Sequence, residues 1–127
     1  TRAPTMRGEP VICAFGCGGD RDRGKRPKMG DAVGRLARRA VVTSDNPRGE
    51  EPEAIIDEIA KGIPSGRFTR IADRREAIAR TIAEAADDDV IVIAGKGHET
   101  YQVVRDQVVH FDDREEAELA LKKRVKK

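Results

Sequence analysis

Short apolar runs alternate along the chain with longer segments in which apolar residues recur every three or four positions. The short runs are four or five residues long, which is typical of buried β-strands, and they cover 11–15, 40–43, 68–72 and 90–94. The longer segments predict helices over 27–37, from Pro52 to a stop at Gly62, and over 74–86. Because strand and helix alternate regularly, the pattern predicts an α/β fold with a mostly parallel sheet and flanking helices.

The last part of the chain follows a different order. Two strand-like segments, 101–105 and 107–111, predict a hairpin around Asp106. The next segment, 112–124, predicts a helix with acids in its first turn and bases in its last, an order that suits the helix dipole. At 127 residues the chain is long enough to bury its own core, so we expect residues 1–127 to form one domain.

Three loops would leave the carboxyl edge of this parallel sheet, namely 16–26, 44–51 and 95–101. Ligands of open α/β sheets bind beyond that edge. The unusual glycine-rich and charged sequences of the chain all fall in these three loops. Their coincidence predicts a binding site at the carboxyl edge.

The loop GDRDRGKR, residues 19–26, nearly matches the phosphate-binding pattern G-x-x-x-x-G-K-[ST]. Arg26 stands where that pattern needs a hydroxyl to bind magnesium, and Asp20 and Asp22 would put negative charge inside the cradle. We therefore reject a phosphate loop of that kind. The loop still predicts the approach of an anionic group, since the glycines before it allow close backbone approach; the alternative is a solvated cluster of charges. Its basic residues are Arg21, Arg23, Lys25, Arg26 and Lys28.

The loops DNPR (45–48) and GKGHE (95–99) combine opposite charges. Arg48 is a fork suited to a carboxylate, whereas Asp45 and Asn46 can fix the loop or meet an ammonium group. Glu99 adds a second acid to the same edge. The set is complementary to the head group of an amino acid, although Asp45 and Arg48 could instead simply tie down the loop.

Composition excludes several classes of partner. The chain is 38% charged, but its net charge is only +2 and its aromatic content 3%, which argues against nucleic-acid binding. Its apolar runs are far shorter than the roughly 20 residues of a membrane span, so we expect no membrane insertion. Cys13 and Cys17 are the only cysteines and favour free thiols in the reducing cytoplasm. No residue spacing predicts a metal site or a catalytic nucleophile.

Three segments, in this order and spacing, resemble the Mur ligases: FGCGGDRDRGKRPKMG (15–30), TSDNPRGEEPEAIIDEI (43–59) and AGKGHETYQ (94–102). The resemblance is to the members that add meso-diaminopimelate and covers nearly the whole chain, but only the C-terminal third of such an enzyme. It implies a Rossmann-like, amino-acid-binding C-terminal domain of an ATP-dependent ligase of peptidoglycan synthesis. In that reaction the D-glutamyl carboxylate of UDP-N-acetylmuramoyl-L-alanyl-D-glutamate is activated as an acyl phosphate, which the amine of the incoming amino acid attacks.

The resemblance also implies roles for single residues. Arg48 would bind the distal carboxylate of meso-diaminopimelate with Asn46 beside it, and Arg21 would add a second contact. Gly95 and Glu99 would take the distal ammonium. The full set of candidate substrate-binding residues is Arg21, Asp45, Asn46, Arg48, Gly95 and Glu99.

The chain lacks the motifs of the UDP-binding and ATP-binding domains that the resemblance implies, so we expect a piece of a longer protein. ATP and Mg²⁺ would be held mainly by the central domain and not by this chain, which would be inactive alone and monomeric. UDP-N-acetylmuramoyl-dipeptide would bind through the other domains. Two other interpretations stay open: a stand-alone amino-acid-binding module, and a nucleotide- or phosphate-binding module that uses residues 19–26.

Overall fold

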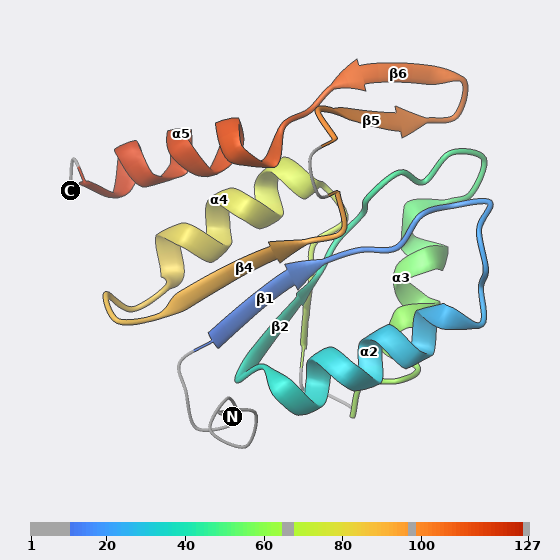
Figure 1. Ribbon diagram of the computed structural model, residues 1–127, viewed down its shortest axis with the longest axis horizontal. Helices are drawn as coiled ribbons and strands as arrows, with labels where there is room; N and C mark the ends of the chain where they lie inside the picture. Colours follow the sequence, from blue (N-terminus) through green and yellow to red (C-terminus); the bar gives the residue numbers. More distant parts are fainter. Residues whose placement is uncertain (1–10, 65–67, 97–98, 126–127) are drawn as a thin grey trace.

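The computed structural model describes residues 11–64, 68–96 and 99–125. Its main sheet has the strand order β3-β2-β1-β4, and every neighbouring pair of strands is parallel (Figure 1). The strands are β1 (Val11–Phe15), β2 (Arg39–Val42), β3 (Phe68–Arg70) and β4 (Val90–Ala94). Phe15 pairs with Val42 on one side and with Ala94 on the other, so these three strands end at one edge of the sheet.

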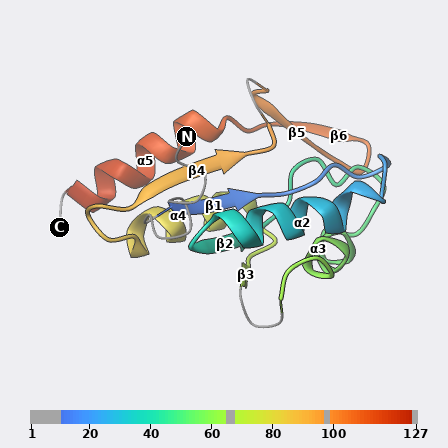
Figure 2. The ribbon, with the colours of Figure 1, turned by 60° about the horizontal axis from the view of Figure 1, so that its bottom comes forward.

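Two pairs of helices cover the two faces of the sheet (Figures 1 and 2). On one face lie α2 (Lys25–Leu36) and α3 (Pro52–Ala60), and on the other lie α4 (Arg74–Glu84) and α5 (Asp113–Val125). The predicted α/β class with a mostly parallel sheet and flanking helices is therefore confirmed.

Alternation along the buried strands separates the two halves of the core, because successive side chains point to opposite faces. Phe15 and Val42 pack with the isoleucines of α3 on one face. Ile12 and Val41 pack with Ala77 of α4 on the other. The core thus consists of two layers of apolar side chains, one under each helix pair.

Close packing of α2 against α3 requires two glycines. A Cβ atom on Gly30 would lie 2.1 Å from the carbonyl oxygen of Ile59, and one on Gly62 would lie 1.8 Å from that of Pro27. Gly62 follows the end of α3 as predicted, and its close contact with the α2 backbone gives it a packing role as well.

The hairpin consists of β5 (Tyr101–Val104) and β6 (Gln107–His110), which pair antiparallel as a separate sheet. It is attached to the loop after β2. The backbone N–H of Arg48 donates to the carbonyl of Val103 at 3.0 Å, and the N–H of Arg105 donates to the carbonyl of Arg48 at 2.8 Å. The predicted hairpin and C-terminal helix are confirmed, and the hairpin braces the carboxyl edge.

Most element boundaries agree with the sequence pattern, with small differences. Strands β1 and β4 and the start of α3 at Pro52 lie where they were predicted, whereas β3 is two residues shorter. Helix α2 begins at Lys25 rather than at residue 27, so Lys25 and Arg26 belong to a helix and not to the preceding loop. Among the described residues no helix is long and apolar enough to span a bilayer.

Candidate functional site

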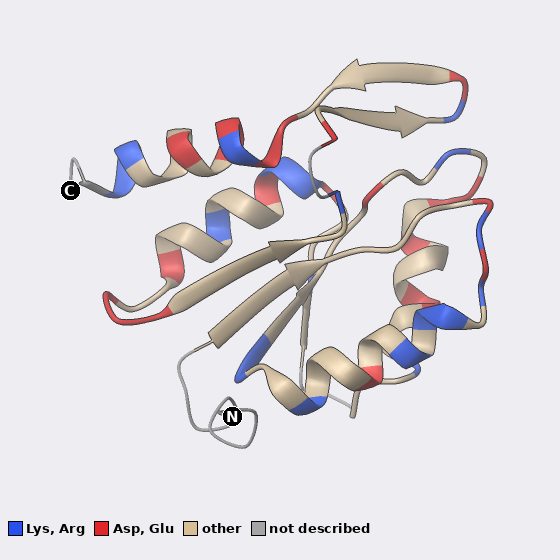
Figure 3. Cartoon of the chain, in the orientation of Figure 1, with Lys and Arg blue, Asp and Glu red and all other residues tan. Residues whose placement is uncertain are grey.

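The loops after β1, β2 and β4 meet at the carboxyl edge of the sheet, as the sequence predicted. The strands β1 and β4 carry no charged residue, whereas charges of both signs gather in the loops beyond them (Figure 3). A cavity of about 320 Å³ opens at this edge between Gly16–Gly18 and the start of α2. Arg21, Asp45 and Gly95, one from each loop, line it.

Glycines let the first two loops touch each other. A Cβ atom on Gly19 would lie 1.8 Å from the carbonyl oxygen of Pro47, and one on Gly16 would lie 2.4 Å from that of Thr43. The N–H of Gly19 donates to the carbonyl of Asn46 at 2.7 Å. The close backbone approach that these glycines predicted is therefore an approach of the neighbouring loop.

The basic loop uses much of its charge internally. Arg26 is only 1% exposed and donates to the carbonyl of Gly18 at 2.9 Å, to Glu50 at 2.9 Å and to Glu58 at 3.1 Å. Its guanidinium, together with the N–H of Asp20, lowers the pKa of Glu50 to about 2. Arg23 also pairs with Glu58 and lowers the pKa of that carboxyl. Two of the five predicted basic residues are thus paired within the protein, and the buried Arg26 holds the loop in place.

Residues 19–26 do not fit a magnesium–nucleotide site. Arg26 occupies the position of the metal-binding hydroxyl and is bound to two carboxylates. In the part of the chain that the structure describes, no cluster of three or more His, Cys, Asp or Glu side chains could hold a metal ion. ATP chemistry is therefore not assigned to these residues.

Arg48 combines a strained backbone with a partly engaged side chain. Its φ of 51° lies in the left-handed region, which favours glycine. Atom Nη1 donates to the carbonyl of Gly19 at 3.1 Å and lies over Gly18, which lines the cavity. Within the described residues, Nε and Nη2 have no hydrogen-bond partner. This edge of the guanidinium can donate two hydrogen bonds to a carboxylate.

Asp45 and Asn46 are joined to a buried lysine. The ammonium of Lys96 donates to Asp45 Oδ1 at 3.0 Å, to Asn46 Oδ1 at 3.0 Å and to the carbonyl of Tyr101 at 2.8 Å. Asn46 Oδ1 also accepts from the N–H of Val103 at 2.9 Å. These contacts tie the DNPR loop to Lys96 and to the hairpin.

Glu99 lies next to Asn46, whose Nδ2 donates to Glu99 Oε1 at 3.3 Å. Gly95 has a φ of 119°, which an L-residue rarely adopts, and it lies close to the carboxylate of Asp45. Arg21 is exposed and donates to the carbonyl of Asp20 at 3.1 Å. The predicted residues thus lie at one edge, whereas Gly97 and His98 of the GKGHE segment lie outside the described residues.

Comparison with known proteins gives a consistent result. The family description "Mur ligase, glutamate ligase domain" matches residues 2–97. The chain belongs to the Mur ligase family.

Among its relatives, the UDP-N-acetylmuramoyl-L-alanyl-D-glutamate–2,6-diaminopimelate ligase of Prochlorococcus marinus is 59% identical over 91% of this chain and 23% of the relative. The ligase of the same name from Parasynechococcus marenigrum is 57% identical over 90% and 23%. A solved structure of a ligase with that name superimposes with a TM-score of 0.86 at 47% identity, covering 91% of this chain and 24% of that one. The chain therefore spans about a quarter of the length of these Mur ligases.

Three residues of this Mur ligase edge were not singled out from the sequence. Lys96 lies between Gly95 and Gly97 of GKGHE and was given no role in the sequence analysis. Gln102 donates to the carbonyl of Asp45 at 2.7 Å, and the buried Arg74 donates to the carbonyls of Ser44 and Ala94 at 2.9 and 3.2 Å. An acid in a buried loop needs a counter-charge, and that need at Asp45 could have drawn attention to Lys96.

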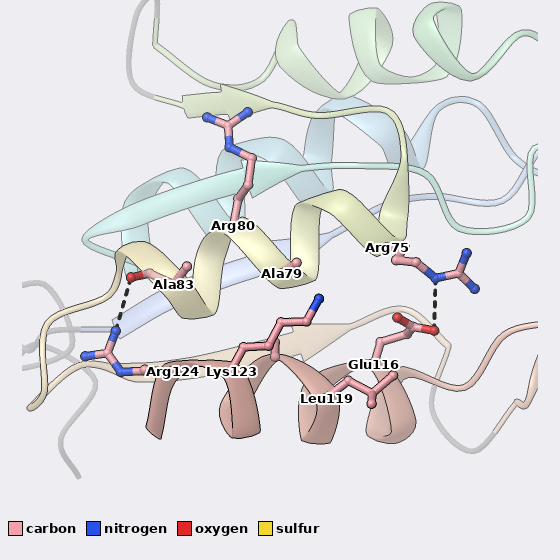
Figure 4. Close-up of a pocket in the computed structure, with 9 residues that line it drawn as sticks. Arg75, Ala79, Arg80, Ala83, Glu116, Leu119, Lys123 and Arg124 are labelled. Carbon is pink, nitrogen blue, oxygen red and sulfur yellow. Dashed lines mark hydrogen bonds and ion pairs between the residues drawn. The ribbon is translucent and has the colours of Figure 1, made fainter. Parts of the chain in front are cut away.

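A larger cavity of about 580 Å³ lies between α4 and α5, away from the three loops (Figure 4). It contains none of the residues that carry the Mur ligase resemblance. Its arginines are paired, since Arg75 meets Glu116 at 3.0 Å, Arg80 meets Glu84 at 3.5 Å and Arg124 meets Asp87 at 2.8 Å. Size alone therefore does not identify the candidate site in this Mur ligase chain.

Proposed function

We propose that the chain is the domain that binds the incoming amino acid in an ATP-dependent ligase joining meso-diaminopimelate to UDP-N-acetylmuramoyl-L-alanyl-D-glutamate. Membership of the Mur ligase family supports the reaction class, and the names of the related ligases support these two substrates. Since the chain spans about a quarter of those relatives, the other substrates would bind elsewhere in the full enzyme.

One observation carries the proposal: an open guanidinium edge on Arg48 lies at the same sheet edge as the carboxylate of Glu99. Arg48 would take the distal carboxylate of diaminopimelate, with Asn46 beside it, and Glu99 would take the distal ammonium together with the backbone at Gly95. Arg21, which lines the neighbouring cavity, would add a second contact. Asp45 would support this arrangement from the same loop.

In this proposal the chain positions the incoming amino acid and supplies no catalytic group. It would hold the attacking amine against the activated carboxylate, and orientation of this kind can supply several kcal/mol of a barrier, on the order of 7–11 in favourable cases. ATP and Mg²⁺ would be bound by other parts of the enzyme. We expect this chain to be monomeric, to act in the cytoplasm and to be inactive without those parts.

Lysine differs from diaminopimelate in lacking the distal carboxylate. If lysine bound, the guanidinium of Arg48 would lose water without gaining a partner, which costs roughly 1–3 kcal/mol. A site that pairs a polar group of its substrate rejects analogues lacking that group more strongly than an apolar pocket rejects a missing methylene. Arg48 would therefore determine specificity.

The test is a titration of meso-diaminopimelate, and separately of L-lysine, into the isotope-labelled chain while backbone amide shifts are recorded. The proposal predicts amide shifts at Arg21, Asn46, Arg48 and Gly95–Glu99 with diaminopimelate and much weaker ones with lysine. A response to neither amino acid, or shifts confined to the cavity between α4 and α5, would contradict it. Titration with ATP tests the phosphate-binding alternative, for which Lys25→Ala would abolish the response.

A further inference from the structure

Lys96 is fully buried, and its ammonium has three partners at the candidate site. The side chain has no exposed surface, and the three acceptors lie at 2.8 to 3.0 Å. An ammonium has three N–H donors, so this number of acceptors satisfies it completely. Two acceptors belong to the DNPR loop and the third to β5, so Lys96 joins the loop after β2 to the hairpin.

This arrangement fixes the orientation of the Asn46 amide. Atom Oδ1 accepts from Lys96 Nζ at 3.0 Å and from the N–H of Val103 at 2.9 Å, and both of these groups are obligatory donors. A flipped amide would turn its NH₂ group toward two donors and lose both bonds. Nδ2 is therefore directed to Glu99, which it meets at 3.3 Å.

The same ammonium balances Asp45. That residue is 9% exposed, and an unpaired carboxylate at such a position would be costly. Oδ1 of Asp45 is bound to the ammonium of Lys96 at 3.0 Å, so the charge of this acid already has a partner within the protein. Glu99 is consequently the acid better able to attract an ammonium from outside.

We infer that Lys96 is a positioning residue for substrate recognition, which holds Asn46 so that its amide N–H groups, and not its oxygen, face the ligand beside Arg48. The inference rests on the proposed function for the identity of the ligand. It adds to that function a reason why Asn46, like Arg48, offers donors to the distal carboxylate: Lys96 and the N–H of Val103 already occupy the amide oxygen.

The test compares Lys96→Met, which keeps the aliphatic stem and removes the charge, with Lys96→Gln, which retains a donor. For the wild-type chain and for each variant that remains folded, two quantities are measured: the affinity for meso-diaminopimelate and the side-chain NH₂ resonances of Asn46. We expect Lys96→Met to shift the Asn46 resonances, to weaken binding about tenfold and to narrow the preference over lysine. Lys96→Gln should give smaller changes in the resonances and in the affinity than Lys96→Met. If Lys96→Met does not fold, Lys96→Gln is the variant on which the inference is tested.

Arg74→Met is the matched control. Arg74 is also fully buried and donates to backbone carbonyls at the same sheet edge, but it contacts neither Asp45 nor Asn46. Arg74→Met should lower the free energy of unfolding as Lys96→Met does. The Asn46 resonances and the affinity for meso-diaminopimelate should stay unchanged in this control.

Unchanged Asn46 resonances and unchanged affinity in folded Lys96→Met would overturn the inference while leaving the proposed function intact. Equal loss of affinity in Arg74→Met would reduce Lys96 to a structural role and overturn it too. If the wild-type chain fails to bind meso-diaminopimelate, the proposed function fails. The Asn46 resonances of the variants still show whether Lys96 fixes the orientation of the Asn46 amide.

Discussion

The loops after β1 and β2 are both rich in charge, but they use it differently. In the first loop and the helix that follows it, Arg23 and Arg26 are bound to Glu50 and Glu58, and Arg26 is almost completely buried. In the second loop, Arg48 leaves part of its guanidinium without a partner among the described residues and keeps a left-handed backbone. The number of charges in a loop therefore says less about binding than which of them the fold leaves open.

The variant Arg48→Gly tests most strongly whether the second loop uses its open charge for binding. Glycine accepts the left-handed backbone, so removing the side chain relieves strain on the order of 1 kcal/mol and should not lower the free energy of unfolding. Loss of the charged hydrogen bonds should weaken binding of meso-diaminopimelate roughly 10- to 100-fold. Calorimetric titration and denaturant unfolding measure the two effects.

Arg105→Gly is the control for that variant. Arg105 also has a positive φ, 58°, and lies in the adjacent turn, but its guanidinium pairs with Glu51 and the carbonyl of Gly49. Affinity should stay unchanged in this variant. A similar loss of affinity in both variants would show that the effect comes from the backbone and not from a clamp at Arg48.

The variant Glu50→Gln tests whether the first loop uses its charge for stability rather than for binding. Removing the charge that pairs with buried Arg26 should lower the free energy of unfolding by about 1–3 kcal/mol and leave affinity nearly unchanged. Urea unfolding of the two proteins measures the difference. A loss of affinity without a loss of stability would mean that this loop also contacts the ligand directly.

The same pair makes stability depend on pH in acid. The pKa of Glu50 is lowered from 4.5 to about 2, so its contribution is present above pH 4.5 and is lost as the pH falls toward 2. Unfolding free energies measured across this range should fall more steeply for the wild type than for Glu50→Gln. Parallel curves would contradict the assigned pair.

Glu99→Gln should have a smaller effect, on binding alone. The amide keeps the shape and the contact with Asn46 but removes the anion that would meet the ammonium, so affinity should fall about tenfold. Melting temperatures should be unchanged, since Glu99 is only half-buried. A fall in melting temperature with retained affinity would make Glu99 a structural residue.

Arg23→Ala should have the smallest effect. Its side chain is 67% exposed, and ion pairs on the surface contribute little because water screens them. Neither affinity nor stability should change measurably. A clear loss of affinity would indicate that an anionic group approaches this loop after all.

The sequence predicts the fold well because its signals are local. The apolar runs of β1 and β4, Pro52 at the start of α3 and the charge order of α5 each depend on neighbouring residues. The edge position of β4 was not predicted, since an apolar run does not reveal how many neighbours a strand has. Val90 is 54% exposed there.

The meeting of the three loops at one edge was predicted, whereas the contacts that connect them were not. The three loops meet because the carboxyl ends of parallel strands share an edge. The roles of Lys96 and Arg26 depend on partners far away in sequence, since Lys96 binds an acid 51 positions earlier and Arg26 binds acids 24 and 32 positions later. No local pattern could identify such pairs.

The central claim is that Arg48 reads the distal carboxylate of the amino acid. It is tested most directly by measuring the affinities of meso-diaminopimelate and L-lysine for both the wild-type chain and Arg48→Gly. The account predicts that the wild type prefers diaminopimelate by roughly 10- to 100-fold and that the variant binds both amino acids with nearly equal, weak affinity. Retention of the full preference in Arg48→Gly would show that another group reads the carboxylate and would contradict the account.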